Sequence, residues 1–210
     1  MGNKRSYFNN FHDFFQSVSQ LAFKIYCPLK YKILVEGREN IPPESAFIIV
    51  SNHQSYGDIP IICHTFGGNH AFIAKQELFS MPFLGLWLRL TGTISVNRNK
   101  PESSVVKKAK EAILRKNWKV AIFIEGTRSQ IEGHLGPPNT GPVYISKLTK
   151  AKLVPVGIQY KNNREVIVKI GEAYTPNIEQ NLEDQSWTCL EKISKLSGML
   201  MPPRNKVQAN

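Results

Sequence analysis

The chain has 210 residues, of which 41% are hydrophobic; it is long enough for one well-packed domain and too short for two ordinary ones. Its formal net charge of +11 indicates an anionic partner. The candidates are nucleic acid, an anionic membrane surface and small phosphorylated molecules. Lysine and arginine are spread through the sequence without a nucleic-acid-binding signature, so we expect no nucleic acid partner. Three widely separated cysteines match no metal-ligand spacing, so we expect reduced thiols, a cytoplasmic compartment and no metal site.

Residues 1–28 carry a helical pattern of large hydrophobic side chains with lysine and arginine at both ends. Such a stripe suits a helix in the headgroup layer of an anionic membrane; the alternative is a stripe packed on the domain's own core or on a second subunit. No segment reaches the roughly 20 apolar residues that a membrane span requires, and the start is too polar for a signal peptide. We therefore predict a peripheral protein on the cytoplasmic face of a membrane. The stripe consists of Phe8, Phe11, Phe14, Phe15, Val18, Leu21, Ala22, Phe23 and Ile25.

From residue 29 to residue 201 the sequence alternates between strand and helix patterns, and residues 202–210 resemble a flexible tail. This alternation predicts one α/β domain, a mixed central sheet flanked by helices, preceded by the amphipathic N-terminal helix. The strand candidates are 31–36, 46–50, 71–74, 93–97, 119–124, 153–159 and 166–170, and the helix candidates are 57–66, 82–90, 102–116, 141–149 and 183–198.

Residues 78–90 are hydrophobic almost all round and rich in methionine, phenylalanine and tryptophan. Two interpretations stay open for this stretch. It suits a buried core, and it equally suits a surface that meets lipid or a groove that holds an acyl chain.

His53 and Asp58 follow an apolar strand candidate and are separated by five positions. On a regular helix this spacing is about 140° of rotation, so the two side chains meet only if the chain bends between them. A carboxylate that orients an imidazole is the minimum equipment for removing a proton from a hydroxyl near neutral pH. We predict that His53 is a general base oriented by Asp58. No serine or cysteine lies in a nucleophile-elbow pattern, so we expect no covalent intermediate.

Two other strand ends carry groups that bind phosphate in proteins. A glycine turn, a hydroxyl and a guanidinium follow one strand as Gly126, Thr127 and Arg128, and Arg98 ends another run. We predict that these four residues bind a substrate phosphate. Glu125 would repel a phosphate, so we expect it to orient Arg128 or to accept a substrate hydroxyl. Ligands of open α/β sheets bind at the carboxyl ends of strands, so this segment and the histidine segment are predicted to share one edge.

Four blocks of the sequence stand out together: Asn52-His53-x4-Asp58, Gly92 to Arg98, Phe123 to Ser129, and Val154-Pro155-Val156. In order and approximate spacing, they resemble the motif blocks of the glycerolipid acyltransferases, the group that contains 1-acyl-glycerol-3-phosphate acyltransferase. The resemblance spans roughly residues 33–170. Two departures from the family pattern are Ile124, where the family usually has proline, and residues 136–141, where the family often has a stretch with a lysine.

The resemblance implies an enzyme of phospholipid biosynthesis that moves a fatty acyl group from a thioester to the free hydroxyl of a lysophosphatidate-like glycerol phosphate. Acyl-CoA or acyl-acyl carrier protein would be the co-substrate, with no bound cofactor. The implied partners are the thioester donor, a lysophospholipid acceptor and an anionic membrane surface. The alternatives are an acyltransferase for another lysolipid or for glycerol 3-phosphate, a thioester hydrolase, and a non-catalytic membrane-binding protein.

Overall fold

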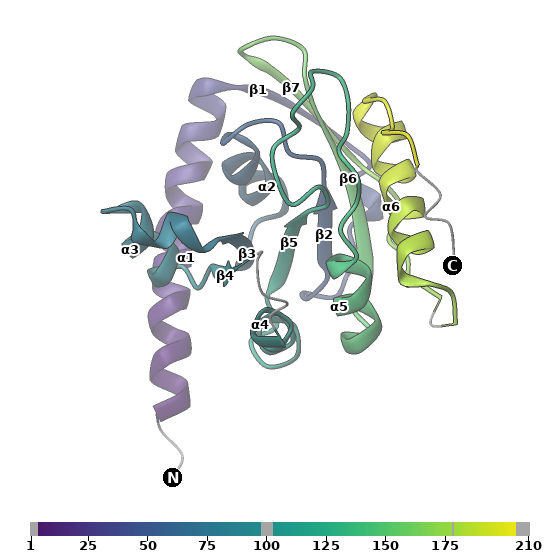
Figure 1. Cartoon of the computed structure of the whole chain (residues 1–210). Helices are drawn as coiled ribbons and strands as arrows, with labels where there is room; N and C mark the ends of the chain where they lie inside the picture. The colour runs from purple at the N-terminus through teal and green to yellow at the C-terminus, as the bar shows by residue number, and fades with distance from the viewer. Residues whose placement is uncertain (1–3, 98–102, 178, 205–210) are drawn as a thin grey trace.

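The computed structural model describes residues 4–97, 103–177 and 179–204, and it confirms the predicted α/β class with a preceding N-terminal helix (Figure 1). Seven strands form one mixed sheet in the order β1-β7-β6-β2-β5-β3-β4. All neighbours are parallel except β6 and β7, which are antiparallel. The strands are β1 (Lys32–Glu36), β2 (Ile48–Ser51), β3 (His70–Lys75), β4 (Ile94–Val96), β5 (Lys119–Phe123), β6 (Leu153–Tyr160) and β7 (Glu165–Ile170). The helices are α1 (Lys4–Lys30), α2 (Asp58–Phe66), α3 (Leu84–Leu90), α4 (Ser103–Leu114), α5 (Gly141–Thr149) and α6 (Leu182–Ser197), with 3-10 helices η1 (Arg38–Asn40) and η2 (Gln76–Ser80).

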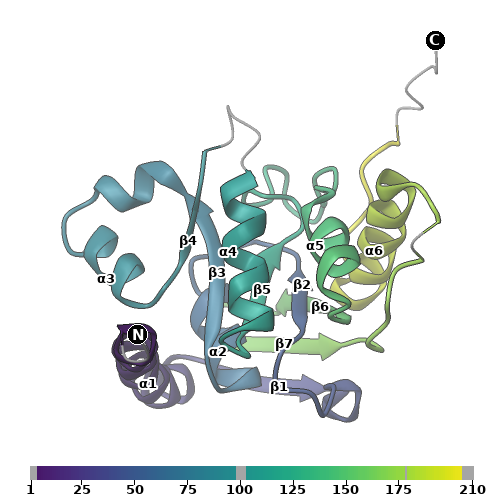
Figure 2. The same cartoon turned by 90° about the horizontal axis from the view of Figure 1, so that it is seen from below.

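Helices cover both faces of the sheet, because the central strands carry hydrophobic side chains on both sides. Figure 2 shows α4, α5 and α6 along one face, and their side chains share a buried cluster with Ile48 and Val50 of β2. Phe47 and Ile49 point the other way, into a second cluster with α2. The central strands are therefore held rigidly between two cores, and the residues that follow their carboxyl ends inherit that rigidity.

α1 turns its polar side toward the domain. Gln16 and Gln20 are buried, and their side-chain amides donate to the backbone oxygens of His70 and Gly68, each at 2.7 Å. The Asn69 amide adds a 2.6 Å hydrogen bond to the Asp13 carboxylate. Most of the stripe residues whose side chains the structure describes face outward, so the alternative in which the stripe packs on the domain's own core does not hold for them. The exposed hydrophobic residues of α1 are Phe11, Phe14, Val18, Leu21, Ile25, Tyr26 and Leu29.

Residues 78–90 also lie at the surface. The predicted helix 82–90 begins only at Leu84, because Phe83 has a φ of 59° that a right-handed helix cannot include. Phe83 is 89% exposed, and α3 packs beside α1, where the rings of Phe15 and Trp87 meet edge to face. We call the exposed hydrophobic residues of α1, together with Met81, Phe83, Leu84 and Leu86, the outer hydrophobic surface.

In the part of the chain that the structure describes, no helix has both the length and the apolar character needed to cross a bilayer. Of the predicted tail 202–210, residues 205–210 lie outside the described residues.

Candidate active site

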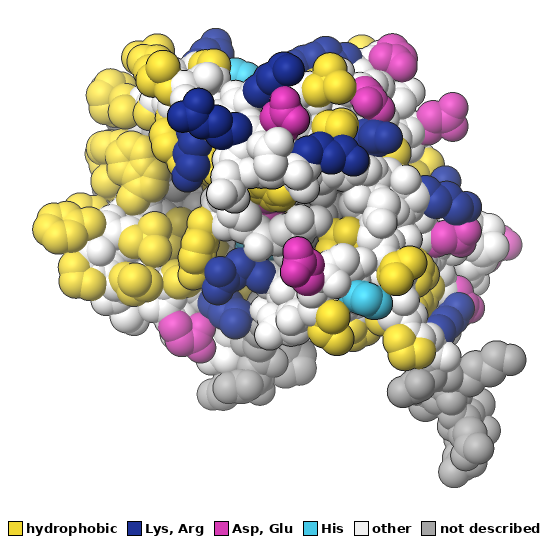
Figure 3. All heavy atoms as spheres, turned by 90° about the horizontal axis from the view of Figure 1, so that it is seen from above, with side chains coloured by type: hydrophobic (Ala, Val, Ile, Leu, Met, Phe, Trp, Pro, Cys, Tyr) yellow, Lys and Arg dark blue, Asp and Glu magenta, His cyan; other side chains and the backbone are white. Residues whose placement is uncertain are grey.

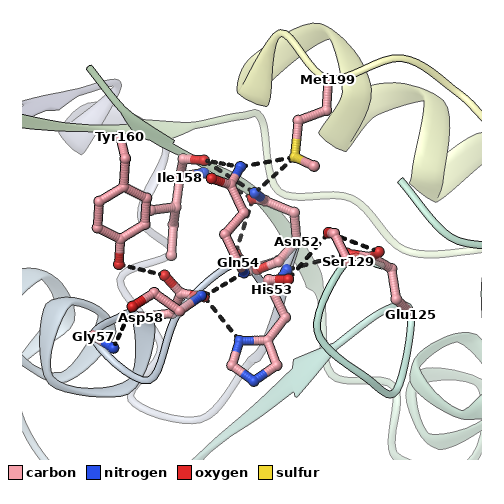
Figure 4. A network of polar contacts seen from close by, with 12 residues as sticks. Asn52, His53, Gln54, Gly57, Asp58, Glu125, Ser129, Ile158, Tyr160 and Met199 are labelled. Atoms are coloured by element: carbon pink, nitrogen blue, oxygen red, sulfur yellow. Dashed lines mark hydrogen bonds and ion pairs between the residues drawn. The ribbon is translucent and has the colours of Figure 1, made fainter. Parts of the chain in front are cut away.

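His53 and Asp58 meet at the carboxyl edge of the sheet (Figure 4). His53 lies two residues beyond β2, and Asp58 is the first residue of α2, so the intervening loop supplies the predicted bend. The distance from His53 Nδ1 to Asp58 Oδ2 is 2.8 Å. The Asp58 side chain is fully buried, whereas the His53 side chain is 15% exposed. Because Nδ1 is engaged by the carboxylate, Nε2 is the nitrogen left to meet a substrate.

The Asp58 carboxylate is held by donors from two segments, the loop before α2 and the end of β6. The backbone N–H groups of Gln54 and Ser55 donate to Oδ2 at 2.7 and 2.9 Å. The Tyr160 hydroxyl, at the end of β6, donates to Oδ1 at 2.6 Å. Burial, followed by the neighbouring Asp58 charge, raises the pKa of Tyr160, so this phenol remains a donor. The carboxylate therefore has a fixed position from which it orients the imidazole.

The face of the His53 ring is fixed by Phe123, the last residue of β5. The two rings stack with centroids 3.8 Å apart and an interplanar angle of 11°. With Asp58 at the ring edge and Phe123 on the ring face, little rotational freedom is left to the imidazole.

Glu125 ties the loop after β5 to the histidine segment. Its side chain is 7% exposed, and it accepts hydrogen bonds from the His53 backbone N–H at 3.2 Å, the Ser129 hydroxyl at 2.9 Å and the Gly136 N–H at 2.8 Å. The Ser129 N–H donates in turn to the His53 carbonyl at 2.7 Å. The two predicted segments therefore share one edge of the sheet. Glu125 supports the backbone of His53, a role that the sequence did not predict.

The predicted phosphate-binding residues lie at the mouth of this edge. The Gly126 N–H donates to the Phe123 carbonyl at 2.9 Å, so this amide is used within the turn and is not open to a ligand. Thr127 is partly exposed and Arg128 is exposed. The Arg128 guanidinium lies 4.3 Å from the centre of the Tyr56 ring, in the histidine loop. Arg98 lies outside the described residues.

Asn52, Phe123 and Tyr160 complete the site; the sequence analysis named Asn52 and Phe123 only as the first residues of motif blocks and did not name Tyr160. Asn52 is buried and makes a reciprocal pair with the backbone of Ile158, with its Oδ1 accepting at 2.8 Å and its Nδ2 donating at 3.0 Å. Tyr160 and Phe123 contact the carboxylate and the ring, as described above. A buried asparagine directly before the histidine was a signal for the first of these. No local pattern signals Tyr160, because its contact with Asp58 spans 102 positions of the chain.

Figure 3 looks onto the top of the molecule, where this edge lies. Hydrophobic side chains gather at one side of the view, and lysine and arginine side chains lie around a hollow near its middle. The exposed Arg128 lies at this edge, and α1, which carries most of the outer hydrophobic surface, packs against α2, whose first residue is Asp58.

A buried carboxylate that orients an imidazole with one open nitrogen is an arrangement that can take a proton from a hydroxyl. Residues 32–159 match the acyltransferase family, and the chain belongs to that family. The resemblance read from the motif blocks is confirmed.

Known relatives are similar over most of this chain. The chloroplastic 1-acyl-sn-glycerol-3-phosphate acyltransferase LPAT1 of Arabidopsis thaliana is 34% identical over 153 residues, which cover 71% of this chain and 41% of that protein. The 1-acyl-sn-glycerol-3-phosphate acyltransferase of Bacillus subtilis is 28% identical over 159 residues, covering 72% of this chain and 74% of that protein. The crystal structure of the 1-acyl-sn-glycerophosphate acyltransferase PlsC from Thermotoga maritima has a TM-score of 0.67 and 26% identity, covering 93% of this chain and 81% of that chain. The chain spans less than half the length of the chloroplastic relative.

Proposed function

We propose that this protein transfers a fatty acyl group from an acyl thioester to the free hydroxyl of a lysophosphatidate-like glycerol phosphate. The observation that carries the proposal is the 2.8 Å contact between His53 Nδ1 and the buried Asp58 carboxylate, which leaves Nε2 open at the edge of the sheet. Several relatives are named for 1-acyl-sn-glycerol-3-phosphate, which supports the choice of acceptor.

In the proposed step, neutral His53 accepts the proton of the acceptor hydroxyl on Nε2 while the hydroxyl oxygen attacks the thioester carbonyl. Asp58 accepts the Nδ1–H hydrogen bond and stabilises the imidazolium that forms. The C–O ester bond forms and the C–S bond breaks. The departing thiolate takes the proton from Nε2, which restores the base, so the step balances without a covalent enzyme intermediate or a bound cofactor. The donor is acyl-CoA or acyl-acyl carrier protein.

The acceptor phosphate is assigned to Thr127 and Arg128. Arg128 is exposed at the mouth and carries a guanidinium that matches a phosphate in bidentate geometry. Glu125 is engaged by three donors in the described structure, so it is assigned to holding the His53 backbone and not to the substrate. Arg98 stays a predicted second cation.

The outer hydrophobic surface is assigned to the headgroup and acyl region of an anionic membrane, on its cytoplasmic face. Seven hydrophobic side chains of α1 are at least 40% exposed while its glutamines are buried, which is the orientation a helix needs to present its apolar side to lipid. The exposed cations Lys24, Lys30 and Arg89 lie on the same two helices and suit anionic headgroups. An acceptor with one acyl chain would reach the site from this surface.

The test is a panel of donors and acceptors, read by thiol release from the thioester. Wild-type protein should release thiol only when an acceptor is present. His53→Ala should lower kcat by roughly 10²- to 10⁴-fold with little change in KM, because it removes the base and leaves the binding groups. Asp58→Asn should also lower kcat, and the double variant should lose little more than the worse single variant, because the two residues act as a unit.

Three outcomes would contradict the proposal. Equal thiol release without an acceptor would identify a hydrolase. Near-normal turnover by a folded His53→Ala protein would remove the general-base mechanism. Vesicle binding without turnover on any donor would favour the non-catalytic alternative.

A further inference from the structure

Asp58 is the link between the base and a second pair of side chains. Its Oδ2 forms a hydrogen bond with His53 Nδ1 at 2.8 Å, and its Oδ1 accepts a hydrogen bond from the Tyr160 hydroxyl at 2.6 Å. The aspartate side chain is fully buried, so water does not compete for either oxygen. His53, Asp58 and Tyr160 therefore form one continuous chain of hydrogen bonds from the open Nε2 to the end of β6 (Figure 4).

The Tyr160 hydroxyl is packed against Tyr31 and Gly57. Tyr31 directly follows α1, and its ring meets the Tyr160 ring edge to face with centroids 6.3 Å apart. A methyl group on Gly57 would lie 2.6 Å from the Tyr31 hydroxyl oxygen and 3.1 Å from the Tyr160 hydroxyl oxygen. Gly57 has φ −66° and ψ −17°, a conformation that alanine adopts freely. The backbone conformation therefore does not require glycine at this position. Glycine is required because the two phenol groups occupy the space that a side chain would need.

We propose that Tyr160 is a positioning residue for the general base, and that its hydroxyl sets the orientation of Asp58 and thereby the proton affinity of His53, with Gly57 and Tyr31 keeping that hydroxyl in place. The inference rests on the proposed function, in which His53 accepts the proton of the acceptor. It adds a third residue, from a distant strand, to the pair that the motif contains.

The sign of the effect follows from the hydrogen bonds. A carboxylate that loses a donor concentrates more charge on its oxygens, and it then stabilises a neighbouring imidazolium more strongly. His53 would hold its proton to higher pH, and the protonated ring cannot act as a base. The other titratable or charged groups near the pair are Tyr31, Glu125 and Arg128, and the Tyr160→Phe substitution removes none of them.

The experiment uses the full chain with Tyr160→Phe, which keeps the ring and removes the hydroxyl. We expect kcat to fall roughly tenfold and KM to change by less than about twofold, because substrate-binding groups are intact. We expect the acid limb of the kcat/KM profile to move to higher pH by about half a unit or more, since hydrogen bonds to charged groups are among the stronger ones. Gly57→Ala places a methyl group 2.6 Å from the Tyr31 hydroxyl oxygen and 3.1 Å from the Tyr160 hydroxyl oxygen, so both phenol groups must shift, and the acid limb should move in the same direction.

Tyr144→Phe is the matched control, because it removes the phenol hydroxyl of an exposed tyrosine on α5 that lies outside this network; its pH profile should equal that of the wild type. An unmoved acid limb in Tyr160→Phe overturns the proposal, even if kcat falls. An unmoved limb in Gly57→Ala overturns the role given to Gly57.

A second readout separates this inference from the proposed activity. The His53 imidazole is titrated by NMR, with its resonance assigned by comparison with His53→Ala. A raised His53 pKa in Tyr160→Phe supports the positioning role whether or not the acyltransferase assay succeeds. An unchanged His53 pKa overturns the positioning role while leaving the acyltransferase proposal untouched.

Discussion

At the residue scale, the pair at the centre of the site was predictable because it is local. His53 lies in the loop after β2 and Asp58 begins α2 at the end of that loop, so the sequence alone limits how far apart their side chains can be. Tyr160 and Phe123 reach the same site from β6 and β5, and their contacts depend on which strands flank β2. That order is set by non-local pairing, which no short pattern of residues contains.

Glu125 illustrates a second limit of residue-level reasoning. The sequence analysis considered only how its charge would act on a substrate phosphate. In the folded chain, the N–H groups of His53 and Gly136 and the Ser129 hydroxyl need acceptors, and the Glu125 carboxylate supplies them. Which donors need a buried acceptor depends on how the two loops fold against each other. This role of Glu125 therefore could not be predicted from the sequence.

Arg128 belongs to the residue scale as a prediction about substrate choice. We expect Arg128→Ala to raise the acceptor KM about tenfold or more, with little change in the donor KM, because a bidentate charge-assisted contact to phosphate is lost. Arg128→Lys should recover only part of the loss, since an ammonium cannot make the bidentate contact. Exposed Arg115, just after α4, provides a control substitution to alanine with unchanged constants. A change confined to the donor KM would reassign Arg128 to the phosphates of coenzyme A.

At the element scale, α1 was predictable as a helix but not in its orientation. A period of three to four gives an amphipathic helix whichever side faces the protein. The choice is made by carbonyl groups at Gly68, His70 and Thr91, which accept hydrogen bonds from the α1 glutamines. Burial, with the nearby Lys119 charge, lowers the pKa of His70 to about 3, so the ring beneath α1 is neutral at ordinary pH.

This orientation leads to a test of the membrane surface. We expect a variant with Phe14, Leu21 and Ile25 all changed to serine to bind anionic vesicles at least about tenfold more weakly in flotation, because each side chain gives up favourable burial in lipid. A matched control changes three other exposed hydrophobic residues to serine, namely Leu114, Ile131 and Leu200. The control should bind as the wild type does. Normal flotation by the first variant together with a changed oligomeric state would instead make this surface a subunit interface.

At the scale of the whole molecule, the class of fold was readable and the strand order was not. Alternating strand and helix patterns predicted a mixed sheet between helices, and the short 161–164 connection is typical of the antiparallel β6–β7 hairpin. The position of β2 between β5 and β6 brings three loops to one edge. Because α1 packs against α2, the outer hydrophobic surface lies beside the edge that carries His53 and Asp58.

The net charge of +11 gives the last prediction, which concerns how salt affects membrane binding. Binding to anionic vesicles should fall by roughly tenfold or more as salt rises from about 0.1 M to about 1 M, because the screening length shortens from about 10 Å to about 3 Å. Binding to neutral vesicles should be weaker and nearly independent of salt, because burial of the outer hydrophobic surface does not depend on charge. The triple-serine variant of α1 separates the two contributions. Its weaker binding to anionic vesicles should remain salt-sensitive, and its binding to neutral vesicles should be lost. If salt has no effect on vesicle binding by the wild type, Lys24, Lys30 and Arg89 do not contact the headgroups. The hydrophobic side chains alone would then hold the protein on the membrane.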